Sequence, residues 1–302
     1  MISKNSIYFK QAELLLKVLP IIRGYPEFAL KGGTAINFFI REMPRLSVDI
    51  DLVYLPVNNR EDALNDIDKI IRDIAGEISI RLKAQTAFNK SMKPVSKLMI
   101  RNNEVLIKLE VNTVIRGAVL EPGYSKTTAA VNALFESEAE MLLISRPELY
   151  ASKICAALDR QHPRDLFDIK LMFEAEGKPA ELMDCFLFYL ISHNRPFHEI
   201  LEPGERDLSE IFNKEFLGMV TEKTDLNDLY ITRSELVEFI KSNLTLNAKK
   251  LLISIMKLEP EWNLIANGIF AEYPSVKWKL SNLKLMDKRK RLEQLKRLES
   301  VF

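Results

Sequence analysis

The chain has 302 residues, of which 47% are hydrophobic, and its 43 lysines and arginines nearly balance its 42 aspartates and glutamates. A domain takes roughly 100–200 residues, so this length predicts two domains or one core with a large appendage, and the apolar content excludes a disordered chain. Two cysteines, Cys155 and Cys185, are too few for a disulfide framework or a four-cysteine zinc site and fit a reducing compartment. The longest wholly apolar run, residues 185–191, is far shorter than the roughly 20 residues of a membrane helix. No signal-peptide pattern is seen either, so we expect a soluble, cytoplasmic protein.

The first 120 residues alternate between helix and strand patterns. Apolar residues at helical spacing predict a helix at residues 6–18, with Ser6 as its cap and Pro20 beyond its end. A longer amphipathic helix is predicted at residues 60–83, with Ile78 among its apolar positions. Further elements are a strand at 27–30, a tight turn at 31–34, a helix opening at 34–42, a strand at 49–56, and a hairpin of strands 95–101 and 104–115 turned at Asn102 and Asn103. This order predicts a mixed sheet flanked by helices.

Beyond residue 143 the strand patterns fade and the chain is expected to be all-α. Helices are predicted at residues 147–159, 164–177, 180–193, 205–220, 232–257 and 278–300. We therefore expect a core domain at residues 1–145 with the mixed sheet, and a helical C-terminal domain at residues 146–302.

The near-zero net charge hides an uneven distribution. Residues 277–302 contain nine basic and three acidic residues, a net charge of +6 that leaves −5 on the rest of the chain. Such asymmetry suggests an anionic partner for the basic end. Leu285, Leu292, Leu295 and Leu298 would form one helical stripe there. A helix docked by these leucines with a solvated charged face is the simpler interpretation, and contact with RNA phosphates is the alternative.

The strongest chemical feature is a pair of glycines followed by a pair of aspartates. Asp49 and Asp51 alternate with apolar residues in a strand, so both carboxylates share one face and suit a hard cation such as Mg²⁺. Upstream, Gly32 and Gly33 allow a close backbone approach to a ligand phosphate. The alternative is that the glycines merely turn the chain and the aspartates are solvated.

Two later features would extend this site. Glu110 lies on the polar face of the strand that contains Ile107 and Leu109, where it would complete a three-carboxylate site, or belong to an ordinary half-exposed strand. Lys153 on the helix at 147–159 would hold phosphates as a point charge. Four charged residues lie around the turn after this helix, and they would either orient Lys153 or form surface ion pairs among themselves. They are Arg160, Arg164, Asp165 and Asp168.

These segments resemble one known family. The stretches LKGGTAINFF, RLSVDIDLVYL, IKLEVN and LYASKICAALDRQHPRDLFDIKLM, within residues 25–175, resemble the AbiEii/AbiGii nucleotidyltransferase-like toxins of type IV toxin–antitoxin and abortive-infection systems, to which the MenT toxins are related. The resemblance implies an α/β (α+β) nucleotidyltransferase fold like that of DNA polymerase β, followed by an all-α region.

The resemblance also implies roles for residues of this sequence. Gly32, Gly33 and Thr34 would hold nucleotide phosphates, and Asp49 and Asp51 would bind the metal, with Glu110 as a third acid. Lys153 and Asp168 would be the later basic and acidic motif positions. Arg45 and Ser47 stand where the family has an arginine and a serine before the acidic pair, and Arg164 joins them as a substrate-binding candidate.

The function expected from these features is Mg²⁺-dependent transfer of a nucleoside monophosphate from an NTP to an RNA hydroxyl, such as a tRNA 3′ end, with release of pyrophosphate. The expected partners are the NTP, the RNA acceptor and a cognate antitoxin, in a toxin–antitoxin or phage-defence system without a membrane. Two alternatives stay open: a small-molecule nucleotidyltransferase, and a non-catalytic nucleotide-binding module that acts through a protein partner.

Overall fold

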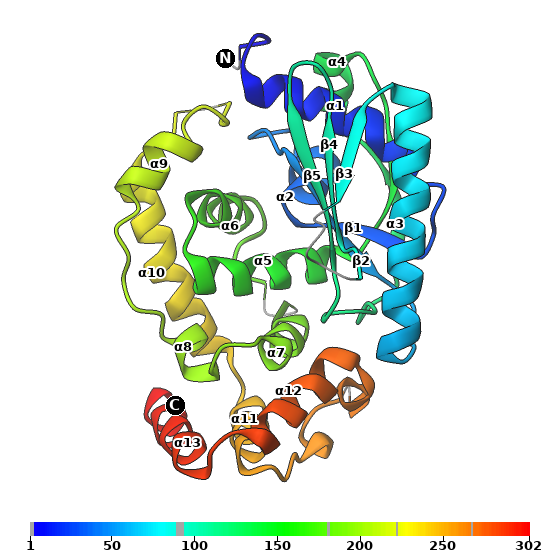
Figure 1. Ribbon diagram of the computed structural model, residues 1–302. Coiled ribbons are helices and arrows are strands. Elements are labelled where there is room, and N and C mark those ends of the chain that lie inside the picture. Colours follow the sequence, from blue (N-terminus) through cyan, green and yellow to red (C-terminus); the bar gives the residue numbers. More distant parts are fainter. Residues whose placement is uncertain (1–2, 89–93, 180–181, 222, 267) are drawn as a thin grey trace. The chain divides into compact units, whose positions relative to one another are not determined.

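The central element of the fold is a mixed β-sheet at the N-terminal side of the chain (Figure 1). The computed structural model describes residues 3–88, 94–179, 182–221, 223–266 and 268–302. The chain divides into two units, one of Met1–Leu149 with Asn213–Thr224 and one of Tyr150–Phe212 with Asp225–Phe302. In the described ranges, no helix is long and apolar enough to cross a membrane.

Seven strands of the described chain form the sheet, in the order β3-β4-β5-β2-β1-β7-β6. Their bounds are β1 Phe28–Lys31, β2 Asp49–Tyr54, β3 Gln85–Phe88, β4 Lys97–Arg101, β5 Leu106–Asn112, β6 Gly123–Lys126 and β7 Glu140–Leu143. At the centre, β2 runs antiparallel to β1 and parallel to β5, while β1 runs parallel to β7. The predicted mixed sheet is therefore confirmed.

Alternating side chains determine which face of the sheet is apolar. In β5, Ile107, Leu109 and Val111 are buried while the residues between them are half-buried, as the sequence pattern predicts. The β4–β5 hairpin is confirmed too, because the Asn102 side-chain oxygen accepts hydrogen bonds from the backbone N–H groups of Glu104 and Val105.

Helices α1 (Ile7–Ile22) and α3 (Arg60–Leu82) contact each other and cover strands of the sheet (Figure 1). Ser6 caps α1 by accepting a hydrogen bond from the Phe9 N–H, as expected. The prediction that α1 ends before Pro20 is wrong. Pro20 lies inside the helix on its exposed side, and burial of Ile21 and Ile22 stabilises the last turn despite the missing N–H donor.

The connection from β1 to β2 is wound more tightly than expected. α2 (Gly32–Ala35) begins directly after β1 and continues as the π-helical turn η1 (Ile36–Ile40), where the sequence predicts a turn and then a helix opening. The strands β3, β6 and β7 and the helix α4 (Ala129–Phe135) were not predicted, because these elements are too short to show a clear apolar pattern.

The second unit is helical, as expected. Its helices are α5 Arg146–Arg160, α6 Pro163–Glu176, α7 Leu182–Ser192, α8 Phe197–Leu201, α9 Ser209–Glu215, α10 Leu226–Asn243, α11 Leu246–Lys257, α12 Pro274–Leu285 and α13 Lys288–Val301. The first residues of α5 and the last residues of α9 belong to the first unit. Short 3₁₀ turns, η2 Trp262–Leu264 and η3 Gly268–Glu272, precede α12. The first two residues of the helix predicted at 180–193 lie outside the described residues, and the rest of this prediction corresponds to α7. The helix α8 was not predicted.

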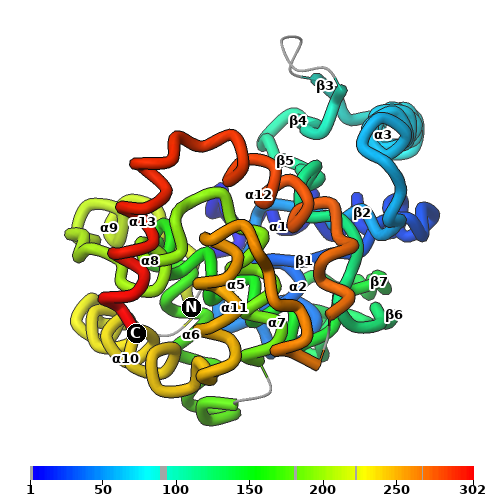
Figure 2. Tube along the Cα trace, turned by 90° about the horizontal axis from the view of Figure 1, so that it is seen from below, coloured from blue at the N-terminus to red at the C-terminus, as the bar shows by residue number. Residues whose placement is uncertain are grey.

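Two long helices predicted from the sequence, at 232–257 and 278–300, are each divided into two shorter helices in the structure. Thr245 caps α11 and Asp287 caps α13, each accepting a hydrogen bond from the N–H three residues later, so the chain breaks at both sites. The predicted leucine stripe is correspondingly wrong in part. Leu295 and Leu298 are buried, whereas Leu285 ends α12 with 86% of its surface exposed. Helix α13 contacts α8 and α11 (Figure 2).

One prediction concerns the apolar face of α3, where Ile78 is fully buried and Ile80 is 79% exposed. Ile78→Ala should lower the free energy of unfolding by about 2–5 kcal/mol, because it removes buried methyl groups and leaves a cavity. The matched change Ile80→Ala should stay within about 0.5 kcal/mol of the wild type. Urea unfolding of both variants measures the difference, and equal losses would contradict the assigned helix face.

Candidate functional site

The acidic residues predicted from the sequence lie on neighbouring strands of the sheet. In the register of β2 and β5, Asp51 is paired with Glu110 and Asp49 with Lys108. On the other side of β2, Asp51 is paired with Lys31 of β1. Paired residues of adjacent strands share a face, so the sheet brings Asp49, Asp51 and Glu110 to one face.

Glu110 is held by lysines rather than by the aspartates. Its two carboxylate oxygens lie 2.9 Å from Lys97 Nζ and 3.0 Å from Lys108 Nζ. Partial burial alone would raise the pKa of Glu110, but hydrogen bonds from Lys97 and Lys108 outweigh burial and keep this pKa below its ordinary value. Among the described residues, no three His, Cys, Asp or Glu side chains form a group that could hold a metal ion.

The two glycines after β1 allow the backbone to lie directly against polar side chains. A Cβ atom on Gly32 would lie 2.6 Å from Asp51 Oδ2, and Gly32 has a φ of +72°, which favours glycine. A Cβ atom on Gly33 would lie 2.6 Å from Arg45 Nη2 and 3.2 Å from Ser47 Oγ. The positive φ favours glycine at position 32, and at both positions the turn packs tightly against the residues that the sequence singles out.

Thr34 connects this turn to β2. Its hydroxyl group is buried and lies 2.6 Å from the Asp49 carbonyl oxygen and 2.9 Å from Ser47 Oγ. Sequence reasoning missed Asn37, which is fully buried and donates a hydrogen bond of 2.9 Å from Nδ2 to the Gly33 carbonyl oxygen. A polar residue inside the apolar run INFFI was the available signal.

A segment from late in the sequence completes the surroundings of Arg45. Met219 O accepts a hydrogen bond of 2.7 Å from Leu46 N, and Val220 forms a β-bridge with Arg45. Thr221 donates from its backbone N–H and its hydroxyl to the Pro44 carbonyl oxygen, at 2.9 and 2.8 Å. The sequence suggested a helix at residues 205–220, so no local pattern could have revealed this pairing.

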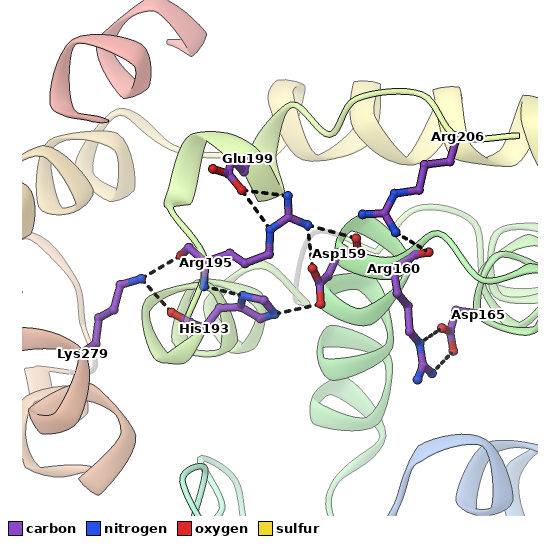
Figure 3. A network of polar contacts seen from close by, with 8 residues as sticks. All are labelled: Asp159, Arg160, Asp165, His193, Arg195, Glu199, Arg206 and Lys279. Carbon is purple, nitrogen blue, oxygen red and sulfur yellow. Dashed lines mark hydrogen bonds and ion pairs between the residues drawn. The ribbon is translucent and has the colours of Figure 1, made fainter. Parts of the chain in front are cut away.

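In the second unit, Lys153 forms the centre of a buried ion cluster. Its Nζ atom lies 2.8 Å from Asp165 Oδ1 and 3.1 Å from Asp168 Oδ2, and its side chain is 5% exposed. Arg160 binds Asp165 through two nitrogens, one of them at 2.9 Å (Figure 3). The structure thus brings together three buried charged residues, Lys153, Asp165 and Asp168, and Arg160 joins them from an exposed position. Half-buried Arg164 donates its backbone N–H to the ring of His162.

Lys153 and Arg160 determine the charge state of Asp165. Complete burial alone would raise the pKa of Asp165, but the charges of Lys153 and Arg160 outweigh burial and hold this pKa well below its usual range. A folded-state pKa below the unfolded value stabilises the fold at neutral pH, and this contribution is lost as the pH falls through the folded pKa.

The second prediction follows from this cluster. Lys153→Met keeps most of the side-chain volume but leaves two carboxylates in the interior, which should cost about 3–5 kcal/mol of unfolding free energy at neutral pH. The deficit relative to the wild type should shrink below about pH 4, because both carboxyl groups can then be protonated. Calorimetry across this pH range checks the change, with Lys170→Met as the control, because this half-buried lysine pairs with the exposed Glu174. A deficit independent of pH would contradict the ion-pair explanation.

Comparison with known proteins identifies the family and the fold. Residues 14–282 match the family model described as nucleotidyl transferase AbiEii toxin, type IV TA system. The structure is similar to MenT4, a nucleotidyltransferase toxin from Mycobacterium tuberculosis H37Rv, with a TM-score of 0.61 over 98% of this chain and 92% of that chain.

The sequences of the two chains are 12% identical, so this likeness shows the fold alone, and it confirms the predicted nucleotidyltransferase fold with a helical C-terminal region. No curated protein matches the sequence. Because the family model spans most of its length, the chain belongs to the AbiEii family of nucleotidyltransferase toxins from type IV toxin–antitoxin systems.

Proposed function

We propose that this nucleotidyltransferase toxin transfers a nucleoside monophosphate from an NTP to a hydroxyl group of RNA, with a tRNA 3′ end as the first acceptor to test. The observation that best supports this proposal is the turn in which Gly32 lies against Asp51 and Gly33 lies against Arg45. Such a turn presents backbone beside one carboxylate and one guanidinium, which suits a triphosphate that is also held by a cation.

The proposal gives each residue of the first unit a distinct role. Gly32, Gly33 and Thr34 would bind the phosphates, because their backbone can approach a ligand closely. Arg45 would balance phosphate charge from its buried position beside Gly33, and Ser47 would orient Thr34 through the contact of their hydroxyl oxygens.

Asp49 and Asp51 fit a divalent cation such as Mg²⁺. Both supply hard oxygen donors on one face of β2, and Gly32 leaves Asp51 Oδ2 against bare backbone. Glu110, at the register position beside Asp51, would become a third ligand by exchanging a lysine for the ion. When bound, the ion would neutralise phosphate charge, which lowers the barrier to phosphoryl transfer.

The second unit supplies the remaining proposed residues. Asp165 and Asp168 hold the Lys153 ammonium group in one orientation, which makes Lys153 a fixed point charge. We propose Lys153 and Asp168 as the later basic and acidic positions of the reaction, with Arg164 as a further substrate contact. The helix α13 exposes Lys288, Arg289 and Lys296, whose charges would attract an RNA acceptor.

The biological setting forms the last part of the proposal. A type IV toxin implies a cognate antitoxin as a partner, and phage defence as one use of the pair. The buried cysteines Cys155 and Cys185 are compatible with the reducing cytoplasm.

The third prediction tests the acidic pair. Asp49→Asn and Asp51→Asn should each lower nucleotide transfer by about 100-fold or more, because each removes a charge that the cation requires. Transfer of each radiolabelled NTP to total RNA, with and without Mg²⁺, measures the effect. Asp73→Asn, at an exposed position of α3, is the matched control and should keep full activity. Full activity in either site variant, with an unchanged melting temperature, would overturn the assignment.

The fourth prediction tests the basic end. Replacing Lys288, Arg289 and Lys296 by Gln keeps helix propensity and the buried leucines of α13. RNA affinity should fall, and the slope of log affinity against log salt should become shallower by up to about 0.7 per lost phosphate contact. NTP affinity should not change. An RNA affinity and salt slope equal to wild type would mean that the acceptor binds elsewhere.

A further inference from the structure

The helical unit contains a second buried lysine, Lys279 of α12, in a setting unlike that of Lys153. Its Nζ atom donates hydrogen bonds to the carbonyl oxygens of His193 and Arg195, at 2.7 and 2.8 Å (Figure 3). The ammonium group also lies 4.7 Å from the centre of the Phe197 ring. Lys279 is 5% exposed, so its charge has been removed almost completely from water.

The two buried lysines differ in how their charge is balanced. Lys153, also 5% exposed, has two carboxylates within 3.1 Å. In the described parts of the chain, Lys279 has carbonyl dipoles and a ring but forms no ion pair. Glu199, the nearby carboxylate, is bound by Arg195 through Nε and Nη2, at 3.0 and 2.8 Å. A buried cation without a counter-charge is costly, so an anion from outside the chain would stabilise this arrangement.

Lys279 also lines a cavity with room for such an anion. The cavity has a volume of about 290 Å³ and lies within the helical unit. Lys290 of α13 contributes a second ammonium group, and Asn194, Asn282 and Gln294 contribute side-chain amides that can donate hydrogen bonds. Glu199 also lines the cavity, and Arg195 balances its charge. Apolar side chains, including Met256 and Met286, form part of the wall.

We propose that this cavity binds a phosphate group, with Lys279 as its principal contact and Lys290 and the amides of Asn194 and Asn282 as further donors. Several convergent donors and two positive charges match a doubly charged group with three terminal oxygens better than a single carboxylate. The cavity is larger than a phosphate, which leaves room for the uncharged remainder of a phosphate ester. The site is independent of the proposed nucleotide transfer.

The charge of Lys279 gives this site a pH dependence of its own. Burial lowers the pKa of Lys279 to about 8, while the charge of Glu199 acts in the opposite direction. An anion binds the ammonium form, so its affinity should fall as the pH rises through 8. Burial lowers the pKa of His193, which is therefore neutral in this range. In the part of the chain that the structure describes, the other charged groups near the site include Glu199, Arg195 with its partner Asp159, and the exposed Lys290.

Sulfate is a suitable probe, because it resembles phosphate and keeps its charge over this pH range. Titration calorimetry of the full chain at constant ionic strength should give an affinity about tenfold weaker at about pH 9.5 than at about pH 7. Lys279→Met should lower the affinity about tenfold at the lower pH and abolish the pH dependence. Lys277→Met, which removes the same charge from an exposed position of α12, should match the wild type. Asn282→Leu, at an exposed position, should weaken sulfate binding and serves as the test if Lys279→Met does not fold.

Competition distinguishes two sources of the phosphate. Displacement of sulfate by adenosine 5′-monophosphate alone would assign the site to small phosphate esters, and displacement by an RNA oligonucleotide as well would assign it to a polynucleotide. Either result supports a phosphate site. Undetectable sulfate binding by the wild type, an affinity that is equal at both pH values, or an unchanged affinity in Lys279→Met would overturn the proposal.

Discussion

The arrangement of the candidate site depends on how closely the Gly32–Gly33 turn approaches the strand and loop behind it. A Cβ atom at Gly32 or Gly33 would lie 2.6 Å from the side-chain end of Asp51 or Arg45, so the absence of side chains lets the turn pack closely against both residues. This contact in turn requires Thr34 beneath the Asp49 carbonyl group and Asn37 beneath the Gly33 carbonyl group. One backbone approach thus determines the positions of the phosphate-binding candidates and the acidic pair together.

The structure of the helical unit depends on a second constraint, which is the free-energy cost of burying charged side chains away from water. Lys153 meets this constraint with Asp165 and Asp168, and Arg195 meets it with Asp159 and Glu199. These pairs connect α5 to α6, which follows it after two residues, and to the segment around α8, which lies farther along the chain. Lys279 is bound by backbone carbonyl groups instead, which satisfies its hydrogen bonds but not its charge.

Much of this structure could be predicted from local patterns, and the failures have a common cause. Alternation in β2 and β5 and the apolar face of α3 are properties of neighbouring residues, so the sequence reveals them. The lysine partners of Glu110 depend on strand register, since Lys97 comes from β4. The burial of Lys153 depends on α6 packing against α5, and a charged cluster alone suggested surface pairs as readily. The resemblance covered residues 25–175, whereas the family match extends through most of the helical region.

The return of residues 213–224 to the first unit has a consequence for how this toxin can be divided. Their backbone groups pair with Pro44, Arg45 and Leu46, in the loop that leads to the acidic strand. A fragment that ends at Leu149 would contain every strand of the sheet and still expose the Leu46 N–H and the Pro44 carbonyl group where Met219 and Thr221 belong. The helical region is thus no detachable accessory, and truncation, domain exchange or proteolysis between α9 and α10 would directly affect the loop that leads to Asp49 and Asp51.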